Sequence, residues 1–262
     1  MLQELDFTGK TALVFGASRG IGLASVITLS NYGATVVLAA RSIKEVNHHA
    51  QTINKSGQQA FAVACDVSDY QAVVAAVDYC LEHTGRIDIV VNNAGIIEPL
   101  SHLITSDPVL WGRAADVNYK GVYHAMRAAV PAMIKAGGGT VVNMSSGAAN
   151  SALLGWSHYC SNKAAAQKLT QVAHRELAQS NIRIVGLSPG TVATDMMAKI
   201  REAKINAVSE LSWDSHIPPE WAAEGVAYLC GPEGAQFAGT DFSIKTVAGR
   251  QRVGLPIEGA QG

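Results

Sequence analysis

A tyrosine and a lysine four residues apart are the side chains of this sequence best suited to proton transfer. Tyr159 and Lys163 lie in a helix-forming stretch, where that spacing places both on one face. A free phenol has a pKa of about 10, and a nearby ammonium favours the phenolate. The pair therefore predicts a phenol with a lowered pKa that exchanges a proton with a substrate oxygen. A surface tyrosine and lysine on an amphipathic helix is the other interpretation, which the rest of the chain must decide.

Ser146 adds a hydroxyl near this pair. It follows an apolar run, residues 140–144, that predicts a buried strand, so its side chain is expected at the carboxyl edge of a sheet. A hydroxyl at such an edge can donate to a substrate oxygen.

A glycine-rich turn near the start of the chain is a candidate phosphate-binding site. The apolar run 11–15 is followed by Gly16-Ala17-Ser18-Arg19-Gly20-Ile21-Gly22 and then by a helical pattern over residues 21–32. In such a strand–turn–helix unit, backbone N–H groups at the start of the helix can bind a pyrophosphate. The spacing G-x3-G-x-G differs from the usual G-x-G-x-x-G, so a purely structural turn is also compatible with it. The predicted cofactor contacts here are Gly16, Ser18, Arg19, Gly20, Ile21 and Gly22.

The end of the second predicted strand bears on the choice of cofactor. An acidic residue at this position binds a ribose 2′-hydroxyl, whereas an arginine accommodates a 2′-phosphate. Ala40 offers no carboxylate, and Arg41 and Arg19 carry guanidinium groups that suit phosphate. The sequence predicts NADP(H) as the preferred cofactor, with NAD(H) as the alternative. The alternative interpretation is that Arg19 and Arg41 are simply solvated and bind no phosphate.

Composition limits the classes of function. The 262 residues are 48% hydrophobic and 16% charged with a formal net charge of -1, which gives no electrostatic basis for binding nucleic acid or an anionic membrane. Four widely spaced cysteines without a C-x-x-C pair indicate reduced thiols rather than a metal site. No apolar run approaches a membrane span, and residues 1–6 lack the features of a signal peptide. We expect a cytoplasmic protein that binds small molecules and no metal.

Alternating apolar runs and helical patterns continue along the chain without a break in composition. Further strands are predicted at 35–39, 61–65, 87–91, 182–187 and 240–245. This predicts an α/β fold: one domain, residues 1–262, with a Rossmann-type, doubly wound parallel sheet of about seven strands and helices on both faces. The ligand crevice should lie at the carboxyl ends of the strands.

Two segments break the regular pattern. Asn118 and Gly121 are both unfavourable inside the long helix that begins near Pro108, so a local irregularity is expected there. Residues 195–216 are polar and helix-prone but contain no strand, which makes them a candidate substrate lid.

These motifs together resemble the short-chain dehydrogenase/reductase family over nearly the whole chain. The motifs that carry the resemblance, in the family's order, are Gly16-x3-Gly20-x-Gly22, Asn92-Asn93-Ala94-Gly95, Asn118, Ser146, Tyr159-x3-Lys163 and Pro189-Gly190. The resemblance implies that Tyr159 donates or accepts the proton and that Ser146 orients the carbonyl. It implies that Lys163 binds the nicotinamide ribose and acidifies Tyr159. It also implies that Asn118 holds a water in a proton relay.

The same resemblance assigns the remaining cofactor contacts. Asp66 and Val67 are expected at the adenine, and Asn93, Ala94 and Gly95 along the adenosine. On the carboxamide side it implies Pro189, Gly190, Val192 and Thr194. Many members close the last strand with an apolar-Asp-Gly-Gly sequence, which residues 243–249 replace here, so the course of the tail 246–262 is not predicted. Residues 156–160 and 194–196 look somewhat like the sepiapterin- and benzil-reductase branch.

The leading hypothesis is an NADP(H)-dependent oxidoreductase, a carbonyl reductase that interconverts a ketone and a secondary alcohol. An NAD(H)-dependent alcohol dehydrogenase of the same family is the alternative. A cofactor-binding regulator without catalysis is disfavoured because Tyr159 and Lys163 are both present. A sugar-nucleotide epimerase or dehydratase is disfavoured because the G-x2-G-x2-G spacing and a larger C-terminal region are missing.

Several other residues receive an expectation. A homodimer or homotetramer is expected through helices 107–135 and 157–180, which carry the small and apolar residues Ala125, Met126, Ala129, Ala132, Met133, Ala164 and Leu169. Trp156 lies on the Tyr159 face and either lines the substrate pocket or packs in the core. His158 and Cys160 are expected to pack, and His48 and His49 to be solvated.

Overall fold

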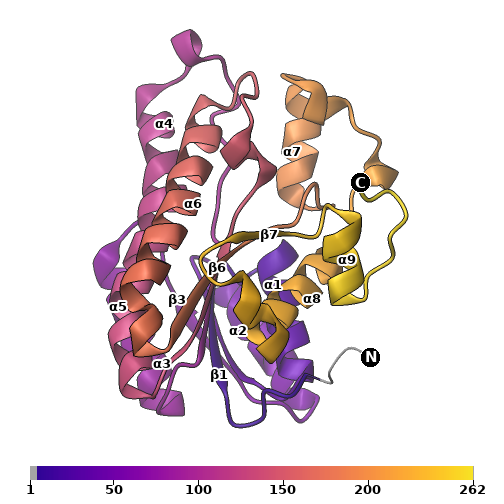
Figure 1. Cartoon of the computed structure of the whole chain (residues 1–262). Coiled ribbons are helices and arrows are strands. Elements are labelled where there is room, and N and C mark those ends of the chain that lie inside the picture. Colours follow the sequence, from indigo (N-terminus) through magenta and orange to yellow (C-terminus); the bar gives the residue numbers. More distant parts are fainter. Residues whose placement is uncertain (1–4, 262) are drawn as a thin grey trace.

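The computed structural model describes residues 5–261, in which seven parallel strands form one sheet in the order β3-β2-β1-β4-β5-β6-β7 (Figure 1). The strands are β1 (Thr11–Phe15), β2 (Thr35–Ala40), β3 (Ala60–Ala64), β4 (Ile89–Asn92), β5 (Gly139–Met144), β6 (Ile182–Ser188) and β7 (Asp241–Ser243). The predicted doubly wound parallel sheet is confirmed. Residues 1–4 and 262 of the predicted domain, and with them most of the stretch inspected for a signal peptide, lie outside the described residues.

Helices cover both faces of the sheet (Figure 1). One layer consists of α1 (Gly20–Asn31), α2 (Ile43–Lys55) and α8 (Pro219–Cys230), and the other of α3 (Tyr70–Thr84), α4 (Pro108–Ala115), α5 (Gly121–Lys135) and α6 (Ser157–Leu177). Because every central strand is buried on both faces, the strands are continuous apolar runs rather than alternating ones. The strand order reverses between β1 and β4: β1 is followed outward by β2, and β4 by β5 in the other direction. The crevice opens at this reversal.

The long helix after β4 contains the predicted irregularity. Residues Asp116–Lys120 form one turn of π-helix between α4 and α5. Asn118 at its centre is fully buried, and its side chain accepts from the Ile96 N–H and donates to the Ile96 carbonyl, both at 2.8 Å. The π-turn thus fixes the loop that follows β4, which is a common use of such turns at functional sites.

Part of the surface predicted for subunit contacts is core instead. Ala125, Met126, Ala129 and Met133 on α5 are buried against the sheet, so they are wrong as interface residues. Apolar side chains that these helices do expose include Val109, Tyr119, Tyr123, Ile134 and Val172. The error arose because small residues on an α/β helix serve close packing on the sheet as readily as packing on another subunit.

The C-terminal tail, whose course the sequence did not predict, folds back onto α8 through α9 (Val247–Val253) (Figure 1). Arg250 anchors it from a buried position, because its guanidinium donates to the carbonyls of Ile244 and Glu258 at 3.1 and 2.7 Å. The same group lies 5.0 Å from the ring centre of Trp221 on α8.

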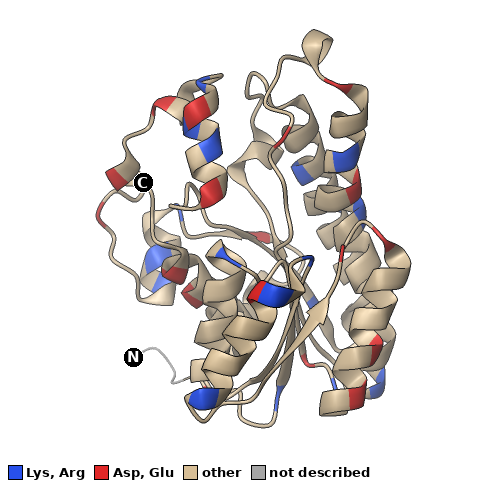
Figure 2. Cartoon of the chain, turned by 180° about the vertical axis from the view of Figure 1, so that it is seen from behind, with Lys and Arg blue, Asp and Glu red and all other residues tan. Residues whose placement is uncertain are grey.

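No helix within residues 5–261 is long and apolar enough to cross a bilayer. Acidic and basic residues are interspersed over the helices, with both signs on the helix α7 (Asp195–Ala203) (Figure 2).

Candidate active site

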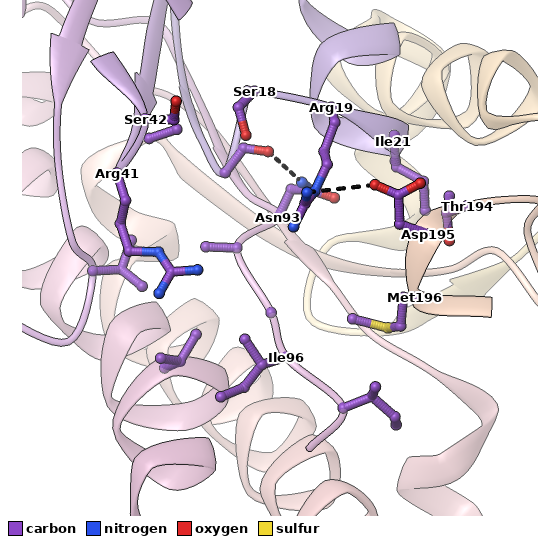
Figure 3. Close-up of a pocket in the computed structure, with 18 of the residues that line it drawn as sticks. Ser18, Arg19, Ile21, Arg41, Ser42, Asn93, Ile96, Thr194, Asp195 and Met196 are labelled. Atoms are coloured by element: carbon purple, nitrogen blue, oxygen red, sulfur yellow. Dashed lines mark hydrogen bonds and ion pairs between the residues drawn. The ribbon is translucent and has the colours of Figure 1, made fainter. Parts of the chain in front are cut away.

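A cavity of about 790 Å³ opens at the carboxyl ends of the central strands. The predicted cofactor residues on its wall are Gly16, Ser18, Arg19, Gly20, Ile21, Arg41, Asp66, Val67, Asn93, Ala94, Gly95 and Thr194 (Figure 3). The other six residues predicted to contact the cofactor are not on the wall: Gly22, Tyr159, Lys163, Pro189, Gly190 and Val192. The volume of the cavity lies within the range of small-molecule and cofactor sites.

The glycine turn needs its glycines for two different reasons. Gly16 has φ 78°, and a Cβ there would lie 2.6 Å from the backbone of Ala94, so β1 and the strand-end loop of β4 can meet only without a side chain. Gly22 does not line the cavity but permits close packing within the turn, because a Cβ there would overlap the Gly16 carbonyl. The Asn93 amide donates to that same carbonyl at 2.9 Å and ties the two loops together (Figure 3).

The start of α1 is suited to an anion. Its N-cap residue, Arg19, provides no side-chain cap for the first N–H groups, and the first turn contains no acidic residue. Such N–H groups and the helix dipole favour a phosphate. The residues present therefore fit the pyrophosphate of a dinucleotide.

Asp66 on the cavity wall, which is predicted to lie near the adenine, takes part in an ion pair that the sequence did not predict. Asp66 accepts from Arg113 of α4 at 2.6 Å and from the Ser68 hydroxyl at 2.7 Å, while Arg113 also donates to Ser68. These hydrogen bonds and the adjacent guanidinium lower the pKa of the Asp66 carboxyl even though burial opposes them. His49, expected in solvent, instead places Nε2 3.1 Å from the Ser18 carbonyl, so it supports the glycine turn.

Two arginines reach the cavity as expected, but their surroundings differ (Figure 3). Arg19 forms an ion pair with Asp195 at 3.4 Å. Arg41, beside Ala40, has no ion-pair partner among residues 5–261 and points into the cavity. Glu45, in the first turn of α2, also lines the wall and brings a negative charge that sequence reasoning missed.

Tyr159, Lys163 and Ser146 come together beside this cavity but not on its wall, and Ile97 belongs both to the wall and to the cluster around Tyr159. The Lys163 ammonium lies 5.7 Å from the centre of the Tyr159 ring. Trp156 packs edge-on against Tyr159 with ring centres 5.5 Å apart, and it is 4% exposed, so it belongs to the core of the site. His158 packs as predicted: it is buried, and Nε2 hydrogen-bonds to the Ile97 carbonyl at 2.7 Å.

The predicted lowering of the phenol pKa is wrong for this structure. Burial raises the pKa of Tyr159 to about 12, although the nearby Ser146 hydroxyl opposes the shift. Burial also lowers the pKa of Lys163 to about 8. Both groups are buried, and the loss of solvation dominates both shifts.

The segment predicted as a lid begins with α7, which covers the tyrosine. Met197 and Ile200 pack with Ile97 and Trp156 in one apolar cluster around Tyr159, which is left 8% exposed. The Lys199 ammonium meets the Glu98 carboxylate at 2.5 Å and joins α7 to the loop after β4. The open cofactor cavity and the covered tyrosine are therefore separate environments.

Asn118 is close to this site, but its side-chain amide is fully engaged by Ile96. Its assignment as the holder of a relay water stays a prediction.

Sequence comparisons agree with this geometry. A family model described as short chain dehydrogenase matches residues 10–205. The chain is 32% identical over 252 residues to 7alpha-hydroxysteroid dehydrogenase of Escherichia coli (strain K12), covering 94% of this chain and 95% of that protein. It is 29% identical over 241 residues to cyclohexanol dehydrogenase of Acinetobacter sp. (strain SE19), covering 91% and 94%.

A solved structure supports the same relationship. A 7 alpha-hydroxysteroid dehydrogenase complexed with NADH and 7-oxo glycochenodeoxycholic acid superimposes with a TM-score of 0.81 at 29% identity, covering 92% of this chain and 94% of that one. The fold, the glycine turn and the tyrosine–lysine pair define a nicotinamide-dependent oxidoreductase. The chain belongs to the short-chain dehydrogenase/reductase family.

Proposed function

We propose that this protein is an NADP(H)-dependent carbonyl reductase that interconverts an apolar ketone and the corresponding secondary alcohol. The observation that carries the proposal is the grouping of Tyr159, Lys163 and Ser146 next to a cavity whose turn and helix start suit a dinucleotide. Membership of the family supports the oxidoreductase chemistry.

The residues have distinct tasks in this proposal. When bound, the nicotinamide cofactor supplies the hydride for reduction. Tyr159, whose raised pKa keeps the phenol protonated at neutral pH, gives its proton to the oxygen that becomes the alcohol. Ser146 donates a hydrogen bond to the same oxygen, and the positive Lys163 stabilises the phenolate that remains.

The surroundings of Tyr159 favour an apolar substrate. The cluster that covers the phenol is built from Ile97, Trp156, Met197 and Ile200, with Leu100, Leu153, Met196, Ile205 and Val208 packed against it. A ring system or other bulky hydrocarbon would replace these contacts when α7 moves away, whereas a polyol would leave its hydroxyls without partners. The two similar enzymes named above act, by their names, on a hydroxysteroid and on cyclohexanol.

The preference for NADP(H) rests on Arg41. Ala40 brings no carboxylate to the ribose, and Arg41 points into the cavity without an ion-pair partner among residues 5–261. A hydrogen bond to a charged group is worth about 1.5–3 kcal/mol, or roughly 10- to 150-fold in binding. Glu45 nearby opposes a 2′-phosphate, and the similar steroid dehydrogenase structure holds NADH, so the preference needs a direct test.

Oxidation of NADPH, measured against a panel of cyclic ketones, steroid ketones and ketoses, tests the proposal. We expect turnover with the apolar members of the panel, and Tyr159→Phe should reduce it at least a thousandfold while NADPH affinity stays within about threefold. Tyr79→Phe, on α3 and away from the cavity, is the matched control and should keep wild-type turnover. Cofactor binding without turnover in wild type would favour the regulator, and turnover retained by Tyr159→Phe would overturn the assignment of the proton donor.

A further inference from the structure

Lys163 is a buried cation whose only hydrogen-bond acceptor in residues 5–261 is neutral. Its side chain is held in the interior at 6% exposure, and its ammonium donates to the Met144 carbonyl at 2.6 Å. No carboxylate within that part of the chain forms a direct ion pair with it. A buried ammonium without compensating charge tends to lose its proton. A nearby negative charge is therefore needed if Lys163 is to stay positive beside Tyr159.

Asp241, the first residue of β7, is the carboxylate placed to supply that charge. Its Oδ2 accepts from the Ser145 hydroxyl at 3.0 Å and from the Gln167 amide at 3.1 Å, whereas its Oδ1 is buried without a hydrogen-bond partner. Gln167 lies one helical turn after Lys163 on α6, and Ser145 directly follows Met144. The anchors of the carboxylate and of the ammonium are thus adjacent residues on the same two elements.

The sheet leaves room for this carboxylate. Gly186 of β6 pairs in register with Asp241, and a Cβ on Gly186 would overlap the Oδ1 atom. The neighbouring strand therefore has no side chain at the one place where the carboxylate needs the space. A half-buried acid whose Oδ1 is buried, whose Oδ2 is anchored by two donors and whose neighbouring strand has a glycine occupies a built position.

We propose that Asp241 is a positioning residue of the dehydrogenase site: it acts through Lys163 as the counter-ion that keeps this ammonium protonated beside Tyr159. The inference rests on the proposed function for its catalytic meaning, but the charge relationship can be measured without turnover. Asp241 and Lys163 do not touch. The aspartate works through its field, which is strong in a poorly solvated interior.

The directions of the pKa shifts agree with this arrangement. Burial lowers the pKa of Lys163 to about 8, and the charge of Asp241 opposes that shift. Burial likewise raises the pKa of Asp241, against which Ser145, Gln167 and Lys163 act. On α6 itself, the titratable side chain beside the Lys163 ammonium is Tyr159, and Cys160 in turn lies beside Tyr159. The facing parts of β5 and β6 contribute neutral groups, namely the Met144 carbonyl, Ser145 and Gly186.

Titration of the lysine side chains by NMR, with ε-¹³C-labelled lysine in the full chain, tests the counter-ion directly. The Lys163 resonance is identified by its loss in Lys163→Met. In wild type we expect its midpoint above pH 7, and in Asp241→Asn about one unit lower, the size of shift that one nearby opposite charge causes. A wild-type midpoint below pH 7, or an unchanged midpoint in Asp241→Asn, would overturn the inference. If the asparagine variant does not fold, Asp241→Ser removes the same charge with a smaller side chain.

Asp88→Asn is the matched control. Asp88 is also a buried carboxylate beside a strand, bound by Arg86 and the Thr11 N–H, but at the opposite end of the sheet. The Asp88→Asn substitution should lower the stability of the fold and leave the NMR titration midpoint of Lys163 unchanged. An equal movement in this control would show a general effect of destabilisation and would overturn the inference.

The kinetic consequence separates this inference from the proposed function. With an active ketone, the alkaline limb of kcat/KM for reduction should move to lower pH in Asp241→Asn by the same amount as the NMR midpoint, while the KM for cofactor changes little. A wild type without turnover would refute the function and leave the NMR result standing. An active enzyme whose alkaline limb stays in place would refute the role of Asp241 alone.

Discussion

Arg19 in the glycine turn and Asp195 at the start of α7 form an ion pair, with Nη1 and Oδ2 3.4 Å apart, at the mouth of the cofactor cavity (Figure 3). Lys199 and Glu98 form a second ion pair one turn further along α7. The first pair is largely exposed to solvent and the second about half exposed, so each contributes at most about 1 kcal/mol. They hold the covering helix weakly, which is compatible with the prediction that this segment acts as a substrate lid.

The Arg19–Asp195 pair predicts an effect on cofactor affinity. Asp195 competes with a cofactor phosphate for the Arg19 guanidinium, and its negative charge repels that phosphate. Asp195→Asn should therefore tighten NADPH binding, by up to about fivefold. Isothermal titration at low salt measures it. Glu202→Gln, an exposed acid at the far end of α7 and not on the cavity wall, is the control for net charge. Equal affinities for wild type and Asp195→Asn would show that Arg19 does not contact the phosphates.

Arg41 should decide the choice between cofactors. We expect wild type to favour NADPH over NADH by at least tenfold in kcat/KM, and Arg41→Ala to reduce the ratio by about tenfold or more because the 2′-phosphate loses its guanidinium. Lys55→Ala, which removes an equal charge at the other end of α2, should leave the ratio unchanged. A wild type that prefers NADH would contradict the assignment.

Gly16 should tolerate no side chain, and a comparison with Gly57 separates the effect of the steric clash from that of backbone strain. Gly16→Ala introduces both a left-handed alanine and a clash with Ala94, whereas Gly57→Ala, at φ 88°, meets nothing within 4 Å. Backbone strain alone costs about 1 kcal/mol. We expect urea denaturation to give about that loss for Gly57→Ala and a clearly larger one for Gly16→Ala, together with loss of NADPH binding in Gly16→Ala alone. Similar losses of stability in both variants would mean that the loop after β4, which contains Ala94, moves away readily.

Burial of Lys163 predicts a pH dependence of stability. Its pKa is about 8 in the folded protein against an ordinary value of 10.5, so between these values the unfolded chain binds the proton and the folded chain does not. The free energy of unfolding then rises with pH. Relative to Lys163→Met, wild type should gain roughly 2–3 kcal/mol from pH 8 to 10.5 in denaturant titrations. Lys168→Met, on the exposed side of α6, should show a flat difference.

The helices α4, α5 and α6 lie side by side in Figure 1. We expect a homo-oligomer that uses the apolar side chains that they expose. Val172→Glu on α6 should shift light scattering toward the monomer because it buries a charge in the contact. Ile27→Glu on α1, in the opposite layer, starts from the same 44% exposure and should have no effect. A wild type that is monomeric at micromolar concentration would contradict the expectation.

The elements and the motif residues were predictable because their determinants are local in sequence. Each strand was found within about two residues at either end, and a local irregularity at the π-turn was indicated by Asn118 and Gly121. A buried parallel strand must be a continuous apolar run, and a glycine turn must precede its helix. Such features need no knowledge of the rest of the chain.

The features that the sequence did not predict depend on distant residues. Arg113 is 47 positions from Asp66, and Gln167 is 74 from Asp241. The raised pKa of Tyr159 was missed for a related reason: the spacing to Lys163 is visible in the sequence, but the apolar residues of α7 that remove solvent from the phenol are not. Desolvation is a property of the assembled site.

The pairing of Gly186 with Asp241 ties two positions together in evolution. A residue larger than glycine at 186 and an acid at 241 exclude each other by volume. An acid introduced at 241 before glycine is present at 186 would distort the sheet. Glycine introduced at 186 first would leave only a small void, which the fold can tolerate. Relatives should therefore carry glycine at the first position without the acid at the second, but not the acid with a bulkier neighbour.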